Sequence, residues 1–291
     1  MKIKFFKMKK VILYIITACI ICCNYAFSSK CSFPHERNYD KDIILAAQEL
    51  CAKLEAAYQS SSKNDLERFL RDWNESLPPN SVEFIKQNDI IEAIFDIYEL
   101  IYKPIDTLKA GNFSEITAYP LIMSQKSNYK YVIVQNKIYY EIIEKEDNFR
   151  KLTEMDFRGN FGNRDSINDF RPPLKLENIQ ALYSLPKYEE AFKMFLGVPF
   201  IRGKVNTNPH TARKDDDRKR YDFLFSHIPI VTGHWGDWRF ATPPGIYCIY
   251  FDKSITTAIV DFVNVNWGYI AIMKKEANGW TIDEIHLVWM T

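Results

Sequence analysis

The strongest constraint on the fold is the pattern of residues from position 228 to the C-terminus. Runs of β-branched and aromatic residues alternate there with short polar turns, which is typical of strands joined by hairpins. The expected strands are residues 228–232, 246–251, 256–263, 269–275 and 280–290. Asn278-Gly279 is a strong hairpin signal, because both residues tolerate a positive φ. The C-terminal part of the chain is therefore predicted to form an antiparallel meander.

In the N-terminal part of the chain, apolar residues recur at the spacing of a helix instead. Apolar residues at three- and four-residue spacing predict a helix over about 42–59 and a second one that runs from about Leu66 to Leu77. Pro78-Pro79 must end the second helix, because proline lacks the N–H and clashes with the preceding turn. Asn88 is expected to cap a third helix that ends before Pro104, and shorter helices are expected at about 188–196 and 215–226.

Two further expectations concern the middle of the chain. Residues 131–134 and 138–142 are strand-like and flank Gln135-Asn136-Lys137, which predicts a β-hairpin. The charged stretch from Glu144 to Pro173 contains two glycines and ends in a double proline, so it is expected to be a long surface loop.

Helices followed by a curved antiparallel sheet predict an α+β fold. The layout is similar to the NTF2-like or cystatin-like architecture, although the chain is about twice as long as one such unit. The expected organisation is a signal peptide at 1–28, a helical segment at 29–110 and an α+β segment at 111–291. Residues 40–110 and 111–291 are expected to form one continuous domain.

The N-terminus has the pattern of an export signal. Five lysines and no acid occupy residues 1–10, and the thirteen residues from Val11 to Cys23 carry no charge. As a helix this run spans about 20 Å, short of the roughly 30 Å hydrocarbon core. Cleavage after Ser28 predicts a periplasmic or secreted protein. The alternative is a lipoprotein processed at Cys19, the one case in which we expect membrane attachment.

Cleavage at Ser28 would leave three cysteines. We expect a disulfide between Cys31 and Cys51, which would close a loop of about 20 residues and contribute roughly 3 kcal/mol in the chain-entropy model. Cys248 lies in an apolar run and is expected to be a small, free core residue.

Charge argues against a nucleic-acid partner. The chain has 38 basic and 37 acidic residues, and loss of the signal peptide would remove five lysines and make the protein mildly acidic. No Lys/Arg-rich face is visible in the sequence, which a protein that neutralises phosphates requires.

The densest group of candidate binding residues lies between 233 and 239. Two tryptophans beside polar and charged groups could form a stacking platform for a sugar or another flat ligand. The alternative is structural, with the tryptophans closing the end of the sheet. The candidate ligand-binding residues are His234, Trp235, Asp237, Trp238 and Arg239.

Catalysis has weaker support. His234 could act as a base oriented by Asp237 or Glu284, which would suit a hydrolase, but no nucleophile is evident. The chain has no HExxH, GxSxG or P-loop motif, and no GxGxxG opens a helix. We therefore expect no catalytic residue, cofactor or metal, and favour a non-catalytic binding protein over a hydrolase.

Several segments together resemble an uncharacterised family of exported bacterial proteins, over about residues 40–291. They are Phe69–Asn74, Tyr131–Asn136, Gly233–Gly236 and Ile249–Asp252, with Ala258, Gly268 and Trp280. The resemblance implies export and brings no activity or catalytic residue with it. The expected partner is a protein, glycan or small ligand of the cell envelope, and an inhibitor of an envelope enzyme is one form of this function.

Overall fold

The computed structural model describes residues 40–102, 129–152, 164–175, 178–196, 215–232, 238–264 and 267–290. For residues 215–218, 231–232, 238–239 and 290 it describes the backbone alone. Lys41–Thr291 belong to one compact unit. The fold is α+β, as predicted from the sequence. No helix in these ranges is both long and apolar enough to cross a membrane.

The helices begin and end close to where the sequence predicts. The side chain of Asn88 accepts a hydrogen bond from the backbone N–H of Ile91 (2.9 Å), which confirms Asn88 as the cap of α5. Ser62 caps α3 in the same way through the N–H of Asp65 (3.2 Å). The described helices are α2 (Lys41–Gln59), α3 (Lys63–Ser76), α4 (Val82–Ile85), α5 (Asp89–Tyr102), α7 (Glu146–Leu152), α8 (Pro186–Leu196) and α9 (Asp215–Phe225).

A six-stranded sheet contains the predicted meander, in the order β10-β9-β8-β7-β2-β3. Its four C-terminal strands pair antiparallel with their sequence neighbours, and Gly279 takes a φ of +113° as the first residue of β10. The meander is thus confirmed for its last four strands. The predicted first strand at 228–232 is wrong, because only Val231–Thr232 are in a strand and they belong to a separate two-stranded sheet. The strands of the meander are β7 (Gly245–Asp252), β8 (Thr257–Asn264), β9 (Trp267–Glu276) and β10 (Gly279–Met290).

The predicted hairpin at 131–142 is wrong. β1 (Tyr131–Gln135) and β2 (Ile138–Ile143) both form, but β1 pairs parallel with β4 (Gln180–Ser184), and β2 pairs parallel with β7. At the end of β1, the side-chain amide of Gln135 accepts a hydrogen bond from the N–H of Ile246 (2.8 Å) and donates one to the carbonyl of Ile246 (3.1 Å). The Gln135 side chain thus makes the two hydrogen bonds that the backbone of a neighbouring strand would make with Ile246. The chain passes from the β1–β4 pair into the six-stranded sheet without a hairpin turn.

The predicted surface loop from Glu144 to Pro173 is also wrong in part. It contains α7 and the edge strand β3 (Asp165–Ile167), and Phe170 is fully buried. The charges that suggested a loop complement the dipole of α7, with acids in its first turn and bases in its last. A short helix with an exposed face has the same composition as a loop.

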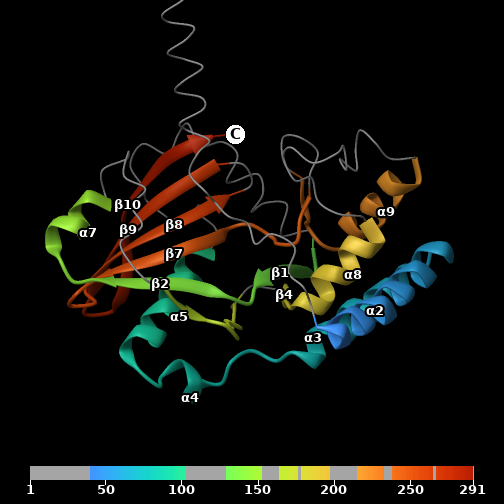
Figure 1. The fold of residues 1–291 in the computed structure, drawn as a ribbon, viewed down its shortest axis with the longest axis horizontal. Helices are drawn as coiled ribbons and strands as arrows, with labels where there is room; N and C mark the ends of the chain where they lie inside the picture. The colour runs from blue at the N-terminus through green and yellow to red at the C-terminus, as the bar shows by residue number, and fades with distance from the viewer. Residues whose placement is uncertain are drawn as a thin grey trace, which may run out of the picture. The chain divides into compact units, whose positions relative to one another are not determined.

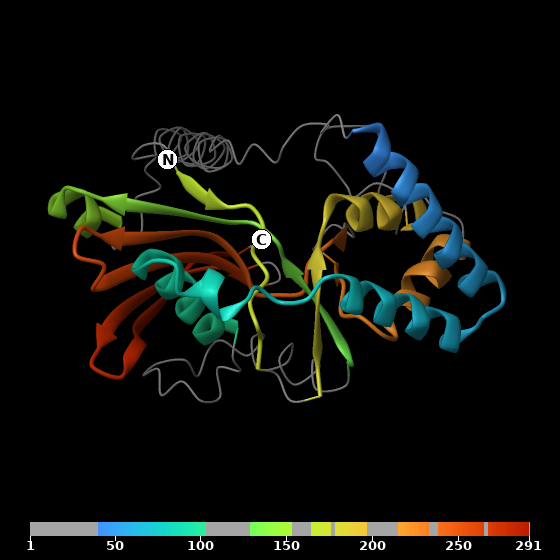
Figure 2. The ribbon, with the colours of Figure 1, turned by 90° about the horizontal axis from the view of Figure 1, so that it is seen from below.

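One core lies between α5 and the six-stranded sheet. Figure 2 shows α5 crossing the face of the C-terminal strands, and its apolar positions share one core with inward-facing residues of β7, β8, β9 and β10. The buried residues of α5 are Ile91, Ala93, Ile94, Phe95, Ile97, Tyr98, Ile101 and Tyr102. The apolar spacing along this helix therefore decides which side of it the sheet occupies.

A second core is formed by α2, α3, α8 and α9 with the β1–β4 pair (Figure 1). Trp73 lies at its centre, stacked on Tyr188 at a ring-centroid distance of 4.1 Å and on Phe240 at 5.8 Å. The indole N–H of Trp73 donates to the carbonyl of Tyr183 (3.1 Å). This bond ties α3 to β4, so the helical group and the small sheet share one core.

Candidate functional site

The tryptophan-rich segment joins the two strands of a short ribbon. Trp238 and Arg239 form β6 (Trp238–Arg239), which pairs antiparallel with β5 (Val231–Thr232). His234, Trp235 and Asp237 lie outside the described residues, and β6 is described by its backbone. The predicted ligand contacts of all five residues therefore stay a prediction.

The chain after β6 is fixed to the helical core. Phe240 stacks on Trp73 and lies edge-on to Phe192 at a centroid distance of 5.0 Å. Thr242 then bonds to β1 twice, because its N–H donates to the carbonyl of Ile133 (2.8 Å) and its hydroxyl accepts from the N–H of that residue (2.9 Å). The C-terminal end of the segment is thus anchored in the core.

Glu284 and His286 lie together on β10, as strand alternation predicts. Nε2 of His286 is 2.8 Å from Oε2 of Glu284, and the glutamate side chain is 56% exposed. The backbone partners of the two residues on β9 are Ile272 and Ile270. Glu284, proposed above as a partner for His234, therefore already has a histidine neighbour on its own strand.

Cys248 is too distant from this histidine to form a catalytic pair with it. The strand partners run from Cys248 through Asp261 and Ile270 to His286. Three strand spacings separate the two residues by about 14 Å. Cys248 is fully buried and its thiol is free, which confirms its predicted structural role. Burial raises its pKa to about 12, so the nucleophilic thiolate is strongly disfavoured.

Cys51 on α2 forms no disulfide with a described residue. Burial raises its pKa, and the nearby carboxylate of Glu55 raises it further. Cys31 lies outside the described residues, so its disulfide with Cys51 stays a prediction.

Ser226 and His227 are in contact but do not form a nucleophile and base. The hydroxyl of Ser226 donates to the carbonyl of Phe223 (2.7 Å), and its oxygen lies 2.7 Å from Nδ1 of His227. Since the only hydroxyl proton is directed at the carbonyl, the oxygen is left to accept a hydrogen from Nδ1. The imidazole is then unable to remove the serine proton through this contact.

Glu141 is a buried carboxyl that the sequence analysis missed. It is 8% exposed, and its Oε2 has no hydrogen-bond partner within the described part of the chain. Burial raises its pKa, and the positive charge of Arg164 partly offsets that effect. The hairpin prediction gave no reason to bury it, because Glu141 pairs with Tyr250 of β7, a strand that is remote in sequence from β2.

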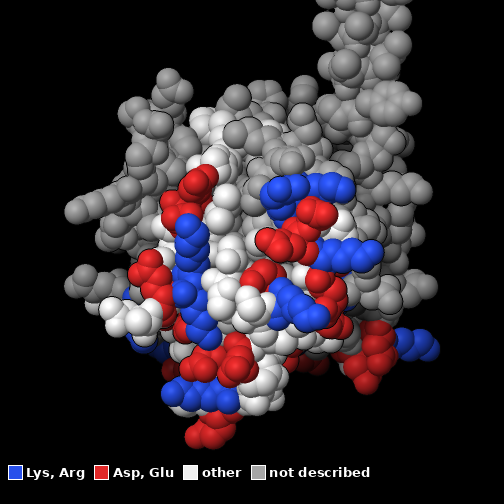
Figure 3. Space-filling view, turned by 90° about the vertical axis from the view of Figure 1, so that its left-hand side faces the viewer, with Lys and Arg blue, Asp and Glu red and all other residues white. Residues whose placement is uncertain are grey.

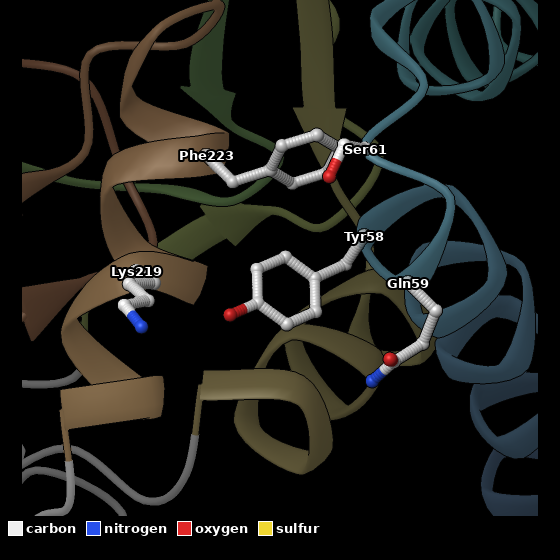
Figure 4. Close-up of a pocket in the computed structure, with 5 residues that line it drawn as sticks. All are labelled: Tyr58, Gln59, Ser61, Lys219 and Phe223. Atoms are coloured by element: carbon white, nitrogen blue, oxygen red, sulfur yellow. The ribbon is translucent and has the colours of Figure 1, made fainter.

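An open hollow of about 410 Å³ lies between the end of α2 and α9 (Figure 4). In Figure 4 the ring of Tyr58 extends from α2 toward α9, with its hydroxyl on the side of Lys219. The rings of Tyr58 and Phe223 meet edge to face at a centroid distance of 5.7 Å. The lining residues are Tyr58, Gln59, Ser61, Lys219 and Phe223.

No local sequence pattern predicts this hollow. Its walls come from residues 58–61 and 219–223, which are brought together by the packing of α8 against both α2 and α9. Arg220, the neighbour of Lys219, forms an ion pair with Glu55 and lies 5.0 Å from the ring centroids of Tyr58 and Phe195. These contacts hold α9 against α2.

Charge on the described surface is mixed in sign. Figure 3 shows basic and acidic side chains interspersed over the end of the molecule that carries α7 and the β9–β10 turn. Ion pairs there include Lys253 with Glu144 (3.1 Å) and Lys274 with Asp283 (2.7 Å). Within the described ranges, no group of three or more His, Cys, Asp or Glu side chains is placed to hold a metal ion.

Comparisons with known proteins add no relative. No family model, no curated protein and no solved structure matches the chain. The fold is thus established at the level of α+β, and the NTF2-like or cystatin-like layout stays a prediction.

Proposed function

We propose that this protein is an exported, non-catalytic binding protein that holds its ligand in the hollow between α2 and α9. The observation that carries the proposal is the hollow itself, where two aromatic rings meet hydroxyl, amide and ammonium groups. Its volume of about 410 Å³ lies within the usual range for small-ligand pockets, roughly 300–1,000 Å³. An apolar wall with a few polar groups suits binding, because the wall provides contact area and the polar groups provide orientation.

The described nucleophiles favour binding over hydrolysis. Burial raises the pKa of both Cys51 and Cys248, and the hydroxyl of Ser226 is directed at a backbone carbonyl. A hydrolase needs an activated nucleophile or an activated water beside a base. None of these three side chains has the surroundings that would activate it.

Export rests on the N-terminal pattern and on the resemblance to exported bacterial proteins. We place the protein in the periplasm or outside the cell, with lipid anchoring at Cys19 as the alternative. Its ligand would then be a small molecule, a glycan or part of a protein of the cell envelope. The segment from His234 to Arg239 is proposed as a second contact surface.

Filling the hollow tests the binding function. Gln59→Trp places an indole at the exposed end of α2, and Gln48→Trp adds the same group to an exposed position of α2 away from the hollow. Envelope metabolites and glycans that raise the melting temperature of the parent protein should fail to do so in Gln59→Trp and should still do so in Gln48→Trp. If every stabilising compound acts equally on both variants, the ligand does not bind in the hollow.

A further inference from the structure

The residues that line the hollow carry a positive charge and no negative charge. Lys219 is the one formally charged residue among the five that line it, and no aspartate or glutamate belongs to this lining. Lys219 is exposed and makes no ion pair within the described part of the chain. Its neighbour Arg220 is instead occupied by Glu55 and by two rings. The hollow therefore presents one cation whose charge no described side chain neutralises.

The same hollow offers an aromatic surface. Tyr58 and Phe223 stand at an interplanar angle of 69°, so one ring presents a face beside the edge of the other. Aromatic groups prefer this edge-to-face or an offset-stacked arrangement, with centroids 4.5–7 Å apart. The side chains of Gln59 and Ser61 make no hydrogen bond to any described residue. They are available to a polar substituent of a bound ring.

From these contacts we infer that the hollow binds a small aromatic molecule that carries a carboxylate, with the ring against Tyr58 and Phe223 and the carboxylate on Lys219. This inference rests on the proposed binding function and narrows it to one ligand class. Charge-assisted hydrogen bonds are shorter and stronger than neutral ones. Because Lys219 is exposed, we expect its charge to change affinity by about three- to tenfold and to lose effect at high salt.

A matched pair of probes tests the ligand class. Binding of 4-hydroxyphenylacetate and of 4-hydroxyphenylacetamide to the mature protein is measured by calorimetry at low and high salt. The acid should bind about three- to tenfold more tightly than the amide at low salt, and the difference should shrink at high salt. The amide also tests whether a negative field near the hollow repels the carboxylate. The acid would then bind less tightly than the amide, and the ligand class would be wrong.

Two lysine variants test whether Lys219 is the cation that binds the carboxylate. Lys219→Met should reduce the affinity for the acid to the level of the affinity for the amide. It should leave the affinity for the amide unchanged. Lys53→Met is the control, because Lys53 is exposed on α2 and does not line the hollow. The inference is overturned if the acid binds Lys219→Met as tightly as it binds the parent, or if the acid shows no binding at millimolar concentration.

The outcomes separate the two proposals. If the amide binds as tightly as the acid, and Gln59→Trp abolishes both, then the ligand class is wrong and the binding function stands. If no probe or envelope compound is sensitive to Gln59→Trp, the binding function of the hollow fails as well. Loss of affinity for the acid alone in Lys219→Met supports both proposals.

Discussion

A side chain at Gly268 should destabilise the fold, because it would overlap the indole ring of Trp289. Gly268 lies on β9 opposite Trp289 of β10. A Cβ added at Gly268 would lie 2.7 Å from Cδ2 of Trp289 and closer still to Nε1 and Cε2 of the same ring. Carbon atoms pack best at about 3.5–4.0 Å, so the indole would have to retreat by about 0.8 Å at Cδ2 and further at the nearer atoms. β9 itself has little room to move, because it is hydrogen-bonded on both sides.

We expect Gly268→Ala to lower the free energy of unfolding by about 1–3 kcal/mol, the usual cost of forcing extra volume into a packed site. Each kcal/mol corresponds to a fall of about 2–4 °C in melting temperature for a domain of this size. Urea unfolding followed by circular dichroism measures the loss. Gly245→Ala is a matched control, since its Cβ would meet only Cγ1 of Val263 at 3.4 Å.

The decisive measurement is the same substitution in a Trp289→Ala background. With the indole gone, Gly268→Ala should cost nothing, or stabilise by a few tenths of a kcal/mol because alanine loses less backbone entropy than glycine on folding. An equal loss in both backgrounds would show that the strain lies in the backbone and not in the indole contact. An unchanged stability of Gly268→Ala alone would refute the packing argument altogether.

Three further predictions follow from local environments. Glu141→Gln should raise the free energy of unfolding by about 1 kcal/mol at pH 7 and leave it unchanged near pH 4. A carboxyl group whose pKa is raised by folding stabilises the fold at pH values below its ordinary pKa. That stabilisation is lost as the pH rises through the pKa of the folded state. Equal effects of this variant at both pH values would contradict the titration argument. Asn88→Ala should lower the melting temperature by about 2–4 °C through loss of the bond to Ile91, and Asn88→Ser should restore most of it, as thermal melts will show. In the mature, oxidised protein Cys31 and Cys51 should resist alkylation until a reductant is added, and labelling of both without reductant in peptide mapping would exclude the disulfide.

Export has its own check in the N-terminal residue of the protein made by its native host. Mass spectrometry should find a mature chain that begins after Ser28, because the run from Val11 to Cys23 is too short to anchor it. An acylated Cys19 at the N-terminus would establish the lipoprotein alternative. A mature pool that retains Met1 would contradict export by either route.

Local sequence predicted the elements whose causes are local. The apolar spacing of α5 and its Asn88 cap placed that helix, and turn residues separated the strands of the meander, since each strand pairs with the next one along the chain. The same reasoning failed at β1 and β2. At that point hydrogen bonds join Gln135 to Ile246, which is 111 residues away in the sequence. The local sequence around β1 and β2 cannot indicate a strand partner at that distance.

The candidate site shows the same division. The sequence directed attention to Trp235 and Trp238 because chemically suggestive residues are adjacent there. The hollow had no such signature, because Tyr58 is one of several half-buried apolar residues of α2 and Lys219 is one of several charged residues of α9. Tertiary packing alone decides that they face one another, through α8 and the contact of Arg220 with Glu55. Burial of Glu141 has the same origin, since the desolvation that raises its pKa comes from neighbours that only the folded chain brings to it.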